Sequence, residues 1–70
     1  MNEAELVQVS FDPKALSERL AAIAEELADG AIERLKVAVE NGDELASAQE
    51  RAITRARRSV EKAVALLEGL

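Results

Sequence analysis

The sequence predicts an all-α fold, an antiparallel helical hairpin, and three observations lead to it. Apolar residues recur at steps of three and four through two long segments, as they do on one face of an α-helix. The segments are separated by Asn41-Gly42-Asp43, which combines a signal for ending one helix with a signal for starting another. Alanine, leucine, glutamate and arginine are frequent, and all of them favour helix. With 70 residues, the chain is long enough for one domain, residues 1–70.

The N-terminal residues 1–11 are expected to form a short extended or strand segment. Val7, Val9 and Phe11 alternate with Gln8 and Ser10, and this period of two is typical of a β-strand. A single strand is not stable in isolation. We therefore expect the segment to pair with another copy, to lie on a helix face or to stay extended.

A first helical arm is predicted over residues 13–40. Asp12 is a strong N-cap residue, because its carboxylate accepts hydrogen bonds from the first helical N–H groups, and Pro13 suits the first helical position. Gly30 weakens a helix by about 1 kcal/mol relative to alanine, and glycine is common at helix ends. The apolar spacing nevertheless keeps its phase across Gly30. The sequence favours one continuous arm and leaves open two shorter helices that meet at Gly30.

A second helical arm is predicted over residues 43–69. Asp43 is its expected N-cap residue, and Glu44 in the first turn interacts favourably with the helix dipole. Apolar residues at steps of three and four are typical of a coiled-coil seam and predict the surface that packs on the first arm. They are Ile53, Ala56, Val60, Ala63, Leu67 and Leu70.

Four arginines fall within the segment RAITRARRSV of a chain whose formal net charge is −5. Arg51 and Arg58 belong to a basic stripe of the second arm, whereas Glu26 and Glu33 belong to an acidic stripe of the first. If the hairpin folds about Gly42, Glu33 lies opposite Arg51, and Glu26 lies opposite Arg58. These residues are therefore expected to form inter-arm ion pairs. The alternative, a phosphate-binding stripe, is disfavoured because the chain is acidic and has no Tyr or Trp for base stacking.

The composition excludes several classes of function. The chain has no Cys and no His, which excludes disulfides, zinc or haem sites with their usual ligands, and a Ser-His-Asp triad. We therefore expect no cofactor, no metal site and no enzymatic activity. No apolar run is long enough to span a bilayer, and the N-terminus does not resemble a signal peptide. These features predict a cytoplasmic or recombinant soluble protein that is neither secreted nor bound to a membrane.

The apolar sector of the first arm covers about half of the helix, which is wider than two helices packed only on each other require. A hairpin that dimerises into a four-helix bundle would bury such a sector. The sequence therefore predicts an association module or scaffold that acts through homo-oligomerisation or docks on one protein partner. The residues expected at that interface are the larger aliphatic ones of both arms: Leu16, Leu20, Ile23, Leu27, Ile32, Leu35, Val39, Ile53, Val60 and Leu67.

Residues 7–42 resemble a ribbon-helix-helix DNA-binding domain in the segments VQVSF, DPKALSERLAAIAEEL and ERLKVAVENG. The resemblance implies that paired strands enter the major groove, that Gln8 and Ser10 contact bases, and that the protein is a DNA-binding regulator or antitoxin. The turn that this family places between its helices would be ADGA here, and the strand has no basic residue. The whole chain also resembles computationally designed helical proteins, because it combines strong caps and paired charge stripes with the absence of Cys, His, Trp and Tyr.

Overall fold

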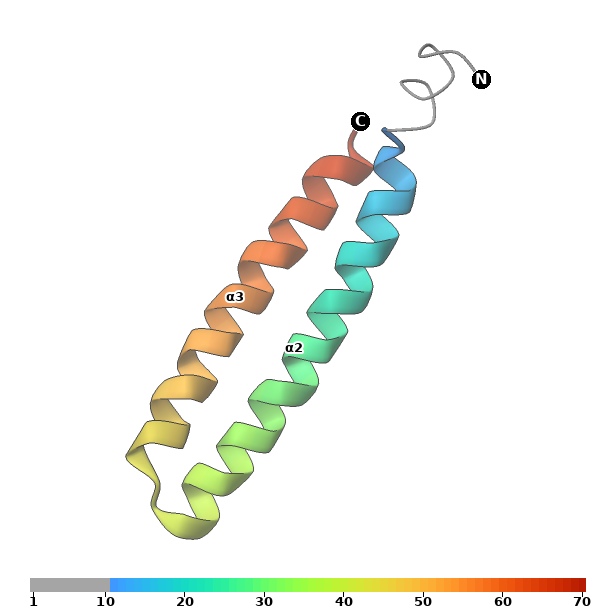
Figure 1. The fold of residues 1–70 in the computed structure, drawn as a ribbon. Coiled ribbons are helices and arrows are strands. Elements are labelled where there is room, and N and C mark those ends of the chain that lie inside the picture. Colours follow the sequence, from blue (N-terminus) through green and yellow to red (C-terminus); the bar gives the residue numbers. More distant parts are fainter. Residues whose placement is uncertain (1–10) are drawn as a thin grey trace.

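The computed structural model describes residues 11–70, which form a hairpin of two packed antiparallel helices (Figure 1). Helix α2 is Pro13–Asn41, and helix α3 is Glu44–Glu68. At 1.5 Å per residue, α2 is about 44 Å long and α3 is about 38 Å long. The C-terminal end of α3 returns to the beginning of α2 (Figure 1). The predicted all-α hairpin is confirmed.

The ends of both helices are fixed by local hydrogen bonds. The Asp12 carboxylate accepts from the Ala15 N–H group at 3.1 Å, and the Asp43 carboxylate accepts from the Ala46 N–H group at 3.0 Å. Gly42 ends α2 in the left-handed region, with φ 60° and ψ 33°, and its N–H group donates to the Ala38 carbonyl. Residues with a Cβ atom adopt this conformation only with strain, whereas glycine adopts it readily. The predicted helix start, turn and second start are therefore all present.

Replacing Asp12 with alanine is expected to lower the free energy of unfolding by about 1 kcal/mol, since the N-cap acceptor is lost. Denaturant unfolding monitored by circular dichroism measures the change. Asp12→Asn is the matched control, because asparagine keeps an acceptor oxygen and should retain most of the stability. Equal losses in both variants would show that the hydrogen bond to Ala15 does not account for the effect.

Helix α2 runs without interruption through Gly30. The structure therefore has one continuous first arm and not two shorter helices that meet at Gly30. The φ angle of Gly30 is not in the left-handed region, in contrast to that of Gly42. The extended segment predicted for residues 1–11 lies outside the described residues, apart from Phe11.

The two helices approach each other along small side chains. Only Ser17, Ala24 and Ala46 are buried among the described residues. The Ser17 hydroxyl donates to the Lys14 carbonyl at 2.8 Å, so this buried polar group is satisfied. Half-buried residues continue the contact on both helices. On α2 they include Leu16, Leu20, Leu27, Ala28, Ala31, Arg34 and Ala38, and on α3 they include Glu50, Ile53, Arg57, Val60, Val64 and Leu67.

The seam predicted for the second arm is wrong in part. Ala56 is exposed, and Leu70 is 80% exposed. Arg57 and Val64 lie at the contact with α2 instead. Helix α3 has apolar residues on two adjacent sectors, and a three-four spacing alone does not decide which sector meets the partner helix.

Candidate association surface

Large apolar side chains are exposed on both helices. No side chain larger than serine is buried in the described part of the chain. A single hairpin thus leaves several large aliphatic side chains largely in water. The exposed large apolar residues are Phe11, Ile23, Ile32, Leu35, Val39, Leu45, Leu66 and Leu70.

A shallow pocket shows which flanks of the two helices share a face. It is lined by Ala21, Ala24 and Ala28 of α2 and by Arg57 and Glu61 of α3, together with Glu25 and Val64. We call the side of the hairpin that carries this pocket the first face. The opposite flanks of α2 and α3 form the second face. On α2, Ile32 and Val39 continue the flank of Ala28 and therefore belong to the first face.

The residues predicted for the interface fall into two groups. Six are half-buried between α2 and α3, and they are Leu16, Leu20, Leu27, Ile53, Val60 and Leu67. Four are exposed, and they are Ile23, Ile32, Leu35 and Val39. Leu45 and Leu66 of α3 were not predicted, although they are 68% and 66% exposed. The sequence feature that could have identified them is the row of uncharged residues at steps of four and three between Leu45 and Leu66.

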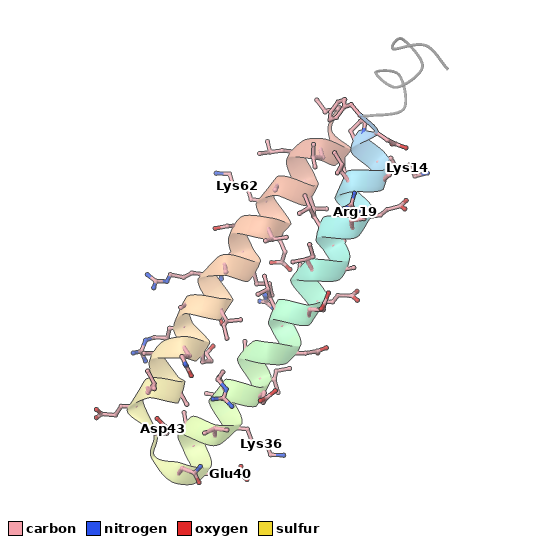
Figure 2. All side chains as sticks on the ribbon, viewed as in Figure 1. Lys14, Arg19, Lys36, Glu40, Asp43 and Lys62 are labelled. Atoms are coloured by element: carbon pink, nitrogen blue, oxygen red, sulfur yellow. The ribbon has the colours of Figure 1, made fainter. Side chains whose placement is uncertain are left out.

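The charged residues lie mainly on the outside of the hairpin, where Figure 2 shows Lys14, Lys36 and Lys62 extending away from the neighbouring helix. Two ion pairs occur within residues 11–70, and both join residues of one helix. Arg34 Nη2 lies 3.2 Å from Glu33 Oε1, and Arg57 Nε lies 3.9 Å from Glu61 Oε1.

Neither predicted inter-arm pair is among the two ion pairs of the described hairpin. Glu33 contacts Arg34, and the Arg51 guanidinium donates to the Ser47 hydroxyl at 2.9 Å. Glu26 and Arg58 are both exposed. The pairing of Glu33 with Arg51 and of Glu26 with Arg58 stays a prediction.

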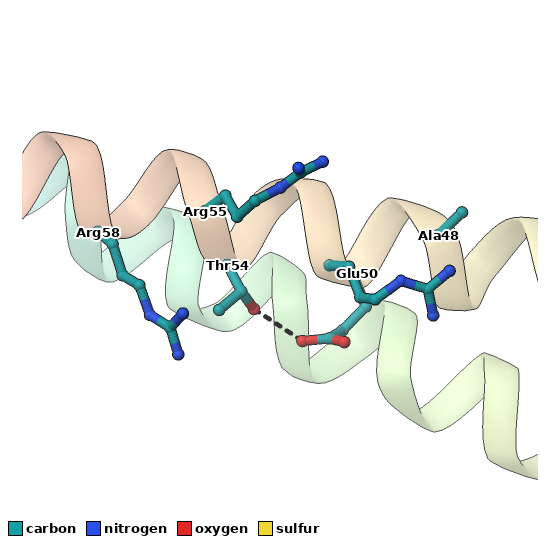
Figure 3. Close-up of a pocket in the computed structure, with 6 residues that line it drawn as sticks. Ala48, Glu50, Thr54, Arg55 and Arg58 are labelled. Atoms are coloured by element: carbon teal, nitrogen blue, oxygen red, sulfur yellow. Dashed lines mark hydrogen bonds between the residues drawn. The ribbon is translucent and has the colours of Figure 1, made fainter.

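The arginine-rich segment surrounds a second pocket, whose lining comes entirely from α3 (Figure 3). Arg51, Arg55 and Arg58 contribute to it, and Arg55 and Arg58 extend in different directions. The Thr54 hydroxyl donates to Glu50 Oε2 at 2.7 Å within the same pocket. A carboxylate already stands among these cations, so the pocket offers a phosphate group a mixed electrostatic environment.

Arg57 has an unusual environment for a cation. Its side chain is 37% exposed, but its Nε atom is buried and has no hydrogen-bond partner. Arg57 lines the first-face pocket together with three alanines of α2, and the 3.9 Å separation between its Nε atom and Glu61 Oε1 is too long for a hydrogen bond. Sequence periodicity did not place Arg57 in the contact, because a long cationic side chain is expected on a solvated face.

The described residues provide no group of three or more Asp or Glu side chains arranged to hold a metal ion. Neither α2 nor α3 combines the length and the apolar character needed to cross a membrane. Gln8 and Ser10, which would contact DNA bases in the ribbon-helix-helix alternative, lie outside the described residues. No protein-family model, curated protein or solved structure matches the chain.

Proposed function

We propose that the protein is a non-enzymatic association module that acts as a homodimer, in which two hairpins form a four-helix bundle. The observation that carries this proposal is the contrast between the core and the surface of one hairpin. Its buried side chains are Ser17, Ala24 and Ala46, whereas Ile32, Val39 and Leu66 are each at least 65% exposed.

The energetic argument follows from the size of the chain. A domain of 70 residues has about 4–10 kcal/mol of stability at typical values per residue. Burial of one large aliphatic side chain contributes about 1.5–3 kcal/mol. A hairpin that leaves its large aliphatic residues partly in water therefore lacks much of the stabilisation that a closed core supplies. A second hairpin would provide it, and small domains commonly use oligomerisation in this way.

The continuous α2 does not favour the ribbon-helix-helix alternative. That family requires a turn between two helices, and residues 28–31, where the resemblance places it, are helical. The described surface also lacks aromatic side chains other than Phe11. The resemblance to designed helical proteins concerns origin and leaves the proposed dimer unchanged.

Melting of the protein is expected to depend on its concentration. Because folding coupled to dimerisation follows mass action, the midpoint temperature should rise from the dilute to the concentrated end of a hundredfold series. Circular dichroism measures this, and sedimentation equilibrium should give twice the 7.5 kDa chain mass. A compact monomer whose melting is independent of concentration would contradict the homodimer. An anisotropy titration with random duplex DNA at low salt should show no binding, and tight binding would favour the regulator instead.

A further inference from the structure

We propose that the second copy packs on the uncharged flank of α3, so that α3 of each copy lies antiparallel against α2 of the other. This inference rests on the proposed homodimer and specifies its face, its helix pairing and its register. The uncharged flank consists of Leu45, Gln49, Ala52, Ala56, Ser59, Ala63 and Leu66.

The uncharged flank extends along the whole of α3 and has the spacing of a coiled-coil seam. Its residues alternate at steps of four and three and include no charge, although the remainder of α3 is rich in Arg and Glu. Leu45 and Leu66 are each at least 66% exposed, and Ala52 and Ala56 are exposed between them. The flank lies on the second face, since the first-face pocket is lined by Arg57 and Glu61 on the other side of the contact with α2.

Gly30 supplies an independent observation on α2. The glycine weakens the middle of the helix, and its backbone conformation does not require it. A Cβ atom added at Gly30 would meet no atom within 4 Å, so packing inside the hairpin does not require it either. The close approach of another backbone is a situation that favours glycine. Leu16, Ile23 and Val37 stand at multiples of seven residues from Gly30 and continue its line along the second face.

The register of the hairpin predicts what would lie opposite Gly30. Ser17 and Leu67 line one pocket within the hairpin, and Ala28 and Arg57 line another. In a bundle whose twofold axis runs along the helices, each helix has antiparallel neighbours from both copies. The same register between copies sets Gly30 opposite Ala52 and Ala56 of the second copy. The smallest residues of the two surfaces then meet where the helices approach most closely.

In the same register, the large apolar residues on the line of Gly30 lie opposite small residues of the uncharged flank. Ile23 falls opposite Ser59 and Ala63 of the second copy, so a large side chain faces two small ones. Leu16 lies near the end of the flank that carries Leu66. The first face offers a poorer match, because Glu50 and Thr54 stand one heptad before Arg57 and Glu61 and make that side of α3 polar.

Charges along the outer edges of the two surfaces are complementary around Arg55. Arg55 and Lys62 directly precede Ala56 and Ala63 and border the uncharged flank of α3. Glu26 and Glu33 border the line of Gly30 on α2, and Arg19 stands one heptad before Glu26 on the same edge. Lys62 of the second copy falls between Arg19 and Glu26. In the proposed register, Arg55 falls between Glu26 and Glu33 of the second copy. If α3 packed on α3 of the second copy instead, the edges that carry Arg55 and Lys62 in both copies would border the same contact, and like charges would repel.

Two substitutions test the face. Gly30→Ala should favour the helix in the isolated hairpin and yet raise the dimer dissociation constant about tenfold or more, because it overpacks the close approach. Ala56→Arg, which adds a charge to the centre of the uncharged flank, should shift the chain to the monomer by sedimentation and reduce its helical signal at concentrations where the original chain is a folded dimer. Ala21→Arg is the matched control on the first face, and it should remain a dimer.

A mixing experiment tests the pairing of the helices. One variant carries Arg55→Glu and Lys62→Glu, and the other carries Glu26→Lys and Glu33→Lys. Each should dimerise several-fold more weakly than the original chain, whereas their mixture should form a heterodimer in excess of the statistical proportion by native mass spectrometry. If these charges interacted only within one hairpin, the mixture would show no preference for the heterodimer. That result would overturn the inference.

The outcomes separate this inference from the proposed function. If the original chain is a monomer at every concentration, the homodimer itself is wrong. If the chain is a dimer, and both Ala56→Arg and Gly30→Ala dimerise as tightly as it does, the homodimer stands but the second copy lies elsewhere. In that case the first face, with Ile32, Leu35 and Val39, is the remaining apolar surface.

Discussion

Replacing Ile53 with aspartate is expected to abolish folding and association together. Ile53 is half-buried where α3 packs on α2, and it lies between the hairpin contact and the uncharged flank. Loss of a large aliphatic side chain from a core costs about 2–5 kcal/mol, and a carboxylate without a partner adds a desolvation penalty. This total is comparable with the whole stability of about 4–10 kcal/mol expected for 70 residues.

Circular dichroism and sedimentation of Ile53→Asp provide the measurement, and most of the helical signal should be lost at micromolar concentration. Ala65→Asp is the matched control, since Ala65 is an exposed residue of the same helix and its replacement should have little effect on folding. Ile53→Val separates the charge from the volume and should cost only about 0.5–1.5 kcal/mol. A stable, helical Ile53→Asp protein would contradict the assignment of Ile53 to the core.

The boundaries of the hairpin could be predicted from the sequence because they depend on local interactions. Asp12, Pro13, Gly42 and Asp43 each act on backbone groups within one helical turn, and the structure contains the expected caps. The observed helices, Pro13–Asn41 and Glu44–Glu68, differ from the predicted arms by one residue at several ends. Such differences are ordinary for helix termini, which fray and end in tight turns.

The orientation of α3 about its own axis could not be predicted in the same way. Ala46, Ile53 and Val60 define one apolar sector, and Ala52 and Ala56 belong to the adjacent one. Alanine carries a weak hydrophobic signal, and a spacing that runs through Ala56 and Ala63 shifts the expected contact toward the adjacent sector. The choice depends on close packing against α2, where the small side chains of Ala24 and Ala46 permit the helices to approach.

The presence of an exposed apolar surface could be predicted from the sequence, but only some of the residues that form it could. The wide apolar sector of α2 correctly indicated unfilled aliphatic surface, since Ile32, Leu35 and Val39 are exposed. Leu45 and Leu66 were not predicted from the sequence. The positions between them on the same flank of α3 are occupied by alanine, serine or glutamine, which give a weak apolar pattern. Their alignment becomes apparent once the contact with α2 assigns the adjacent sector of α3.

Replacing Arg57 with leucine is expected to stabilise the hairpin, in contrast to most substitutions at a helix contact. The buried Nε atom of Arg57 has no hydrogen-bond partner, and an unsatisfied buried donor costs about 1–3 kcal/mol. Leucine removes that donor and places apolar atoms against Ala24 and Ala28. The substitution also removes the ion pair with Glu61. This pair is long, and both of its side chains are more than one third exposed, so its contribution to stability is about a few tenths of a kcal/mol at most.

Denaturant unfolding of Arg57→Leu should therefore show a rise of about 1–3 kcal/mol in the free energy of unfolding. Arg58→Leu is the matched control, because Arg58 is exposed on the same helix and its replacement should change stability by less than about 0.5 kcal/mol. Arg57 lies on the first face, away from the uncharged flank, so Arg57→Leu should retain the dimer. A loss of stability in Arg57→Leu together with an equal loss in Glu61→Gln would show that the ion pair stabilises the contact by more than the unpartnered Nε atom costs.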